Sequence, residues 1–129
     1  MLEKKENVLF SRCFLGVPCR YHGRIVSSPA KVARLSKKFN LIPVCPEHLG
    51  GLPVPRPPAP LKNKKGEKIF DILGNDLSLS FKKGALQTLE IAKRYNCKKA
   101  YLCKNSPSCD KRGFAGELLE KNGIKVINL

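Results

Sequence analysis

The chain has 129 residues, 42% hydrophobic and 27% charged, which is the composition of one globular domain with a core of its own. The 25 Lys and Arg residues outnumber the 10 Asp and Glu residues, and the net charge of +15 attracts anionic partners such as nucleotides or RNA. There is no apolar run of the roughly 18 residues that span a membrane and no signal-peptide pattern, so we expect a cytoplasmic protein without a membrane partner.

The amino-terminal third predicts two strands separated by a helix. Residues 7–13 are a short apolar run with β-branched and aromatic side chains, typical of a strand, and the run ends in a cysteine. After a loop with Gly and Pro, Ser28 and Pro29 form a helix-start signal for a helix within 27–39. Residues 41–45 predict a second strand, which again ends in a cysteine.

The middle of the chain predicts a long irregular segment and then a long helix. Residues 50–68 are rich first in proline and then in lysine, without periodicity, and residues 68–73 predict a short strand or a turn. Asp76 is placed to cap a helix that runs to about Tyr95 and has apolar residues on one face. Gly84 is expected to weaken this helix modestly.

The carboxy-terminal part predicts a strand over 99–104, a helix over 116–123 that stops at Gly123, and a last strand over 124–129. Strands therefore alternate with helices along the whole chain. This order predicts a small Rossmann-like α/β fold, a three-layer sandwich with a mostly parallel sheet, and we expect residues 1–129 to form a single domain.

Six cysteines in a reducing compartment indicate metal binding, catalysis or burial rather than disulfides, and their spacing contains no C-x2-C pair of the zinc-finger type. Ligands of such folds bind beyond the carboxyl ends of the strands. Cys13, Cys45 and, after a four-residue turn, Cys109 follow predicted strands at this edge. Together they can surround one centre of iron–sulfur, zinc or copper(I) type.

The other three cysteines allow further interpretations. Cys19 could join the centre from the loop after the first strand. Cys97 lies beside a helix end and Cys103 lies inside a predicted strand, so both are interpreted as buried apolar residues. The alternative for the whole set is six buried structural thiols.

Four blocks of the sequence, taken in their order, indicate a family: CFLG (13–16), CRYHG (19–23), VCPEHLGGLPVPRPP (44–58) and SPSC (106–109). They closely resemble the thiouracil desulfidase (TudS-like) family of bacteria and archaea, a domain family formerly of unknown function. The resemblance covers residues 8–23, 41–59 and 99–116, and the proline-rich block is very specific.

The resemblance implies a 4Fe–4S cluster held by three cysteines, with one open iron for the sulfur of the substrate. Carried over by motif, the ligands are Cys13, Cys45 and Cys109, with Cys19 in reserve. The implied activity is a desulfidase that removes sulfur from thiolated uracil compounds by non-redox hydrolysis and releases hydrosulfide. Thiouracil, 4-thiouridine monophosphate and 4-thiouridine in tRNA are the implied substrate types.

The same blocks imply catalytic and substrate-binding residues. Glu47 is the implied general base, and Ser106 would orient the ring or relay a proton. Glu47 could instead cap a turn, and Ser106 could be an ordinary turn residue. Arg56 is expected to present its guanidinium to a phosphate or a base carbonyl, or to bond loop carbonyls, and Arg20 and Tyr21 are secondary candidates for substrate contact.

The sequence departs from the family pattern at His22, where relatives usually have Asp, and at Asp110, where they have Gly. The segment between SPSC and the last helix is also shorter than in relatives. An acidic Asp110 beside a ligand cysteine is unfavourable unless a cation pairs with it, and Lys111 and Arg112 are the candidates.

Two other functions compete with the desulfidase. The first is a basic RNA- or tRNA-binding module with a structural metal site, which the charge of +15 favours, although no RRM, KH or OB pattern is visible. The second is a sulfur carrier that uses Cys19 or Cys109 as a nucleophile. The blander interpretation of the charge is a solvated surface, since paired lysines are spread along the chain.

Overall fold

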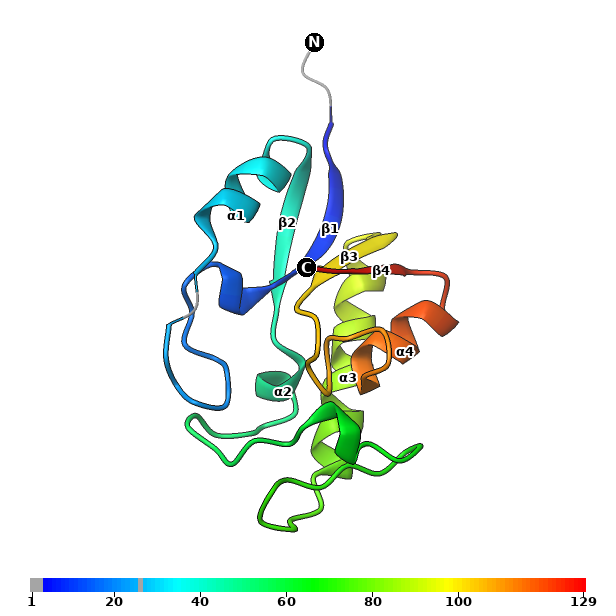
Figure 1. The fold of residues 1–129 in the computed structure, drawn as a ribbon. Helices are drawn as coiled ribbons and strands as arrows, with labels where there is room; N and C mark the ends of the chain where they lie inside the picture. The colour runs from blue at the N-terminus through cyan, green and yellow to red at the C-terminus, as the bar shows by residue number, and fades with distance from the viewer. Residues whose placement is uncertain (1–3, 26) are drawn as a thin grey trace.

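The computed structural model describes residues 4–25 and 27–129 (Figure 1). Four strands form one parallel sheet in the order β2–β1–β3–β4. Their bounds are Glu6–Ser11 for β1, Phe39–Val44 for β2, Lys99–Leu102 for β3 and Lys125–Asn128 for β4. The expected parallel sheet is therefore confirmed, and all of its described pairings are parallel.

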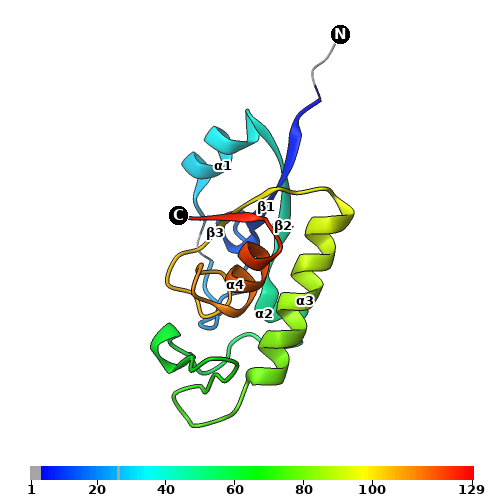
Figure 2. The same ribbon diagram turned by 90° about the vertical axis from the view of Figure 1, so that its right-hand side faces the viewer.

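Three helices connect the strands: α1 (Pro29–Ser36) lies between β1 and β2, α3 (Ser78–Arg94) between β2 and β3, and α4 (Phe114–Lys121) between β3 and β4. Figure 2 shows α1 and α3 on opposite sides of the sheet, and α4 packs against both α3 and β4. The predicted three-layer α/β architecture is confirmed. None of the helices in the described ranges combines the length and the apolar character that a membrane crossing needs.

Both faces of the central strand β1 are covered. Its neighbouring residues Leu9 and Phe10 point to opposite faces, and both are fully buried. Leu102 in β3 and Val126 in β4 are fully buried as well. Such continuous burial is expected of parallel strands that have helices on both faces.

The strands end earlier than the sequence predicts. Cys13 lies two residues beyond β1, in a 3-10 turn over Arg12–Phe14, and Cys45 directly follows β2. The expectation that Cys103 lies inside a strand is wrong, because β3 ends at Leu102. The N–H of Cys103 donates to the hydroxyl of Ser11 at 2.8 Å, so a side chain takes this donor instead of a neighbouring strand.

The two predicted helix-start signals differ in the hydrogen bonds that their side chains make. Ser28 precedes α1 as predicted, but its hydroxyl makes no capping hydrogen bond. The N-cap of α3 is Leu77, not Asp76, but Asp76 lies one residue before it, and its Oδ1 accepts the N–H of Ser78, the first residue of α3, at 2.9 Å and the Ser78 hydroxyl at 2.5 Å. These hydrogen bonds from Ser78 lower the pKa of Asp76.

A short helix, α2 (Pro46–Leu49), follows β2 and packs directly on α3. The two backbones touch at glycines: a Cβ on Gly84 would lie 1.9 Å from the carbonyl oxygen of Pro46, and a Cβ on Gly50 would lie 2.1 Å from that of Ser80. Gly84 is therefore more than a weak point of α3, because it permits the approach that sets the position of α2.

We expect Gly84→Ala to destabilise the fold by about 1–3 kcal/mol, as overpacking does, although alanine is the better helix former. The added methyl would overlap the Pro46 carbonyl and push α2 away from α3. Urea unfolding followed by circular dichroism measures the change. Lys83→Ala, at the exposed neighbouring position, is the control and is expected to stay within about 0.5 kcal/mol of wild type. A Gly84→Ala variant as stable as this control would contradict the prediction.

Candidate active site

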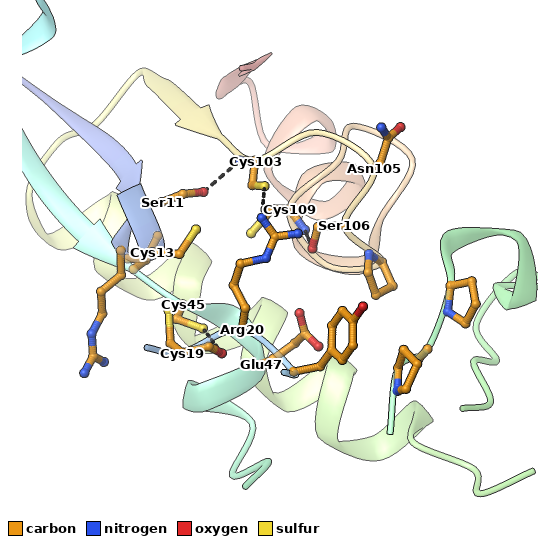
Figure 3. Close-up of a pocket in the computed structure, with 17 residues that line it drawn as sticks. Ser11, Cys13, Cys19, Arg20, Cys45, Glu47, Cys103, Asn105, Ser106 and Cys109 are labelled. Atoms are coloured by element: carbon orange, nitrogen blue, oxygen red, sulfur yellow. Dashed lines mark hydrogen bonds between the residues drawn. The ribbon is translucent and has the colours of Figure 1, made fainter. Parts of the chain in front are cut away.

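A cavity of about 390 Å³ opens at the carboxyl ends of β1, β2 and β3 (Figure 3). The connection that leaves β1 runs to β2 on one side, and β3 lies on the other side, so the cavity is at the point where the strand order reverses. Ligands of open α/β sheets bind at this place. Five of the six cysteines line the cavity: Cys13, Cys19, Cys45, Cys103 and Cys109.

Four of the cavity thiols, those of Cys13, Cys19, Cys45 and Cys103, shift the pKa values of one another. Contact with Cys103 and Cys19 and burial raise the pKa of Cys13, and contact with Cys19 raises that of Cys45. Hydrogen bonds from Cys13 and Cys45 lower the pKa of Cys19. Burial, followed by the charge of a nearby carboxylate, raises the pKa of Cys109 to about 12. Within the described residues, no three His, Cys, Asp or Glu side chains are grouped to hold one metal ion. The five thiols instead line the cavity.

The two cysteines that were interpreted as buried apolar residues differ in their surroundings. Cys97 is buried and lies outside the cavity, as expected. Cys103 is also buried, but it lines the cavity, and its sulfur accepts a hydrogen bond from Nη1 of Arg20 at 3.5 Å (Figure 3). Sequence reasoning missed this placement because it extended β3 past Leu102.

Glu47 stands in the first turn of α2 and lines the cavity. Its Oε1 lies 3.1 Å from Nη2 of Arg56, and its Oε2 accepts the hydroxyl of Ser108 at 3.1 Å. Ser108 is almost fully buried and was not singled out from the sequence, although it belongs to the SPSC block. Both carboxylate oxygens of Glu47 are therefore held by named partners.

Ser106 also lines the cavity, and its hydroxyl oxygen organises the turn before Cys109. It accepts the N–H of Ser108 at 3.2 Å and that of Cys109 at 3.1 Å. The same oxygen lies 3.1 Å from the Ser108 hydroxyl, which continues to Glu47. The turn role that the sequence left open for Ser106 is thus present, together with a hydrogen-bonded connection to the carboxylate.

Of the three residues that were predicted to contact the substrate, two line the cavity and one does not. Arg20 and Tyr21 line the cavity. Arg56 does not: its guanidinium is bound to Glu47 and to the carbonyl oxygens of Cys19 and Pro53, at 3.2 and 3.1 Å. The expectation that Arg56 presents a free donor fork to the substrate is therefore corrected in favour of its alternative, an arginine that bonds loop carbonyls.

Asp110, next to Cys109, has the cationic partner that its position requires. Nε and Nη2 of Arg112 donate to its two oxygens at 2.9 and 3.2 Å, and the N–H of Asn105 donates at 2.8 Å. The bonds from Arg112 lower the pKa of Asp110 to about 2. Lys111, the other candidate, instead bonds Asn128 through its backbone.

Comparison with known proteins adds to this geometry. A model of the 2-thiouracil desulfurase family matches residues 8–128. A protein of Bacillus subtilis (strain 168), described as uncharacterized protein YbbK, is 37% identical and aligns over 94% of this chain and 94% of its own length. A solved structure described as the 4Fe-4S-dependent thiouracil desulfidase TudS is 32% identical, with a TM-score of 0.82 over 96% of this chain and 91% of that chain. The resemblance drawn from the sequence blocks is confirmed.

Proposed function

This chain belongs to the 2-thiouracil desulfurase family, and we propose that it is an iron–sulfur enzyme that removes sulfur from a thiolated uracil compound. The observation that carries the proposal is the meeting of five cysteines and Glu47 in one cavity at the strand ends. The proposed reaction is a hydrolysis without redox change. The oxygen of water bonds to the ring carbon and the carbon–sulfur bond breaks. One of the two protons of the water leaves with the sulfur as hydrosulfide, and the other passes to solvent.

The donor set of the cavity fits a 4Fe–4S cluster, because cysteine thiolates are the usual ligands of such clusters. Cys13, Cys45 and Cys109 would hold it, with Cys19 in reserve, and three protein ligands would leave one iron open. When bound, the cluster supplies a soft Lewis acid for the sulfur of the substrate. Cys97 lies outside the cavity and has no part in this assignment.

The chain's own residues would move the protons. Glu47 would take a proton from the attacking water, as a general base does, and later release it toward the departing sulfur. The Ser108 hydroxyl links Glu47 to the Ser106 hydroxyl, through two contacts of 3.1 Å. These contacts support a path for the proton along the cavity lining, and Ser106 would orient the ring of the substrate.

The substrate would be a small thiolated base or nucleotide. Arg12 and Arg20 line the cavity, and their guanidinium groups suit a base carbonyl or a phosphate. Tyr21 is 39% exposed and offers a ring face for stacking on the base. With the net charge of +15, these groups favour a phosphorylated substrate such as 4-thiouridine monophosphate over free thiouracil.

An RNA- or tRNA-binding module with a structural metal site is the second candidate, and the charge of +15 is the observation that favours it. Either function fits a reducing cytoplasm, where free thiols persist.

The test is anaerobic reconstitution with iron and sulfide, followed by incubation with 2-thiouracil, 4-thiouridine monophosphate and tRNA that contains 4-thiouridine. We expect about four irons per chain, loss of the thiocarbonyl absorbance and release of an equal amount of hydrosulfide. Absence of iron uptake and of hydrosulfide would overturn the proposal. Salt-sensitive retention on RNA by such an iron-free protein would favour the binding module.

A further inference from the structure

Arg56 is a deeply buried cation in a chain whose other cations are mostly exposed. Its side chain is only 5% exposed, and its guanidinium makes three contacts: with the carboxylate of Glu47 at 3.1 Å and with the carbonyl oxygens of Cys19 at 3.2 Å and Pro53 at 3.1 Å. The backbone N–H of Arg56 also donates to the carbonyl of Tyr21, at 2.7 Å. Arg56 therefore connects α2 with the 19–21 segment and with its own proline-rich loop.

The guanidinium of Arg56 approaches Glu47 from outside the cavity. Glu47 lines the cavity and Arg56 does not, so the guanidinium meets the carboxylate from the wall side. Ser108, on the other oxygen, is almost fully buried. An ionised carboxylate has about four lone-pair sites, and these two partners use one on each oxygen. The remaining sites are available to water in the cavity.

Stability alone is a weak reason to bury this ion pair. Removing charges from water is costly, and an apolar side chain of similar volume often supports a fold as well or better. The contact instead fixes the orientation of the Glu47 carboxylate, because a guanidinium is planar and its donors have fixed geometry. Both backbone carbonyls bond the same group, so the guanidinium cannot turn without losing them.

We infer that Arg56 is a positioning residue for Glu47. It orients the carboxylate so that the unused lone pairs face the cavity, and it ties that carboxylate to the segment that carries Cys19, Arg20 and Tyr21. Arg56 acts through Glu47 and does not contact the substrate. This inference rests on the proposed function, in which Glu47 is the general base.

A double-mutant cycle tests the inference with Arg56→Met, Glu47→Gln and the double variant, each reconstituted and matched for iron per chain. A misplaced catalytic group costs about 100-fold, so we expect Arg56→Met to lower kcat by about that factor and to change KM little. In the Glu47→Gln background the same change is expected to cost less than about threefold, because residues that act as a unit are not additive.

Two further variants complete the experiment. Arg56→Lys keeps the charge beside Glu47 and is expected to recover at least about tenfold of the loss in kcat, because the ion pair survives while the planar fork is lost. Arg94→Met removes an exposed arginine that is paired with Glu90 at 3.3 Å, and it is expected to leave kcat unchanged.

Equal losses from Arg56→Met in the wild-type and Glu47→Gln backgrounds would overturn the positioning role. So would a fall, in both Arg56 variants, in the iron taken up per chain during reconstitution before the samples are matched, since that marks a purely structural arginine. A wild-type protein that binds iron but releases no hydrosulfide from any of the three substrates would instead overturn the proposed function itself. The two failures are therefore distinguishable.

Discussion

Replacing Cys13, Cys45 or Cys109 by alanine is expected to abolish stable iron binding, whereas Cys97→Ala is expected to bind iron like the wild type. The first three cysteines come from separate segments after β1, β2 and β3 and line one cavity, and Cys97 lies outside it. A cluster held by three cysteines loses one of its three attachments when one of them is replaced, so it would be released or degraded more easily. Iron and labile sulfide per chain, beside the visible spectrum, are the measurements.

Cys97→Ala is a matched control because it also removes a buried thiol, and burial raises its pKa to about 11. Cys19→Ala and Cys103→Ala identify the other two cavity thiols. Full iron binding by both would support the proposed set of three ligands. Loss of iron in Cys19→Ala together with full binding by one of the three would transfer that ligand role to Cys19.

Replacing Glu47 by glutamine is expected to lower kcat by about 100- to 10,000-fold while iron per chain stays constant, as the removal of a general base does. Glutamine keeps the size of the side chain and can still accept the hydrogen bond from Ser108. It cannot take a proton from water. Steady-state release of hydrosulfide from the reconstituted protein measures the loss, and the iron content shows whether the cavity is intact.

Glu117→Gln is the matched control for this change. Glu117 pairs with Lys64, a cation whose side chain is only 9% exposed, at 2.7 Å, and it lies outside the cavity of the cysteines. Its neutralisation tests whether loss of any partly buried ion pair reduces turnover. Similar losses in both variants would contradict a specific role of Glu47.

Much of the secondary structure of this protein was determined by its local sequence. Alternating apolar runs and helix-start signals predicted the order of strands and helices, because backbone propensity and the burial period act over a few residues. Asp76 bonds Ser78 at the start of α3, within one residue of the predicted N-cap, because this contact spans only two residues. The VCPEHLGGLPVPRPP block led to the family, and Arg112 was one of the two predicted partners of Asp110.

The tertiary structure decided what local patterns could not specify. Cys103 entered the cavity because the Ser11 hydroxyl, 92 residues away, accepts its N–H where β3 ends. Gly84 permitted the close approach of α2 to α3, which no pattern within one helix can express. The direction of the Arg56 guanidinium was likewise decided by Glu47 and by the carbonyl of Cys19, 37 residues away. Contacts between distant segments depend on how the crossovers place the strand ends, and side-chain periodicity carries no information about that placement.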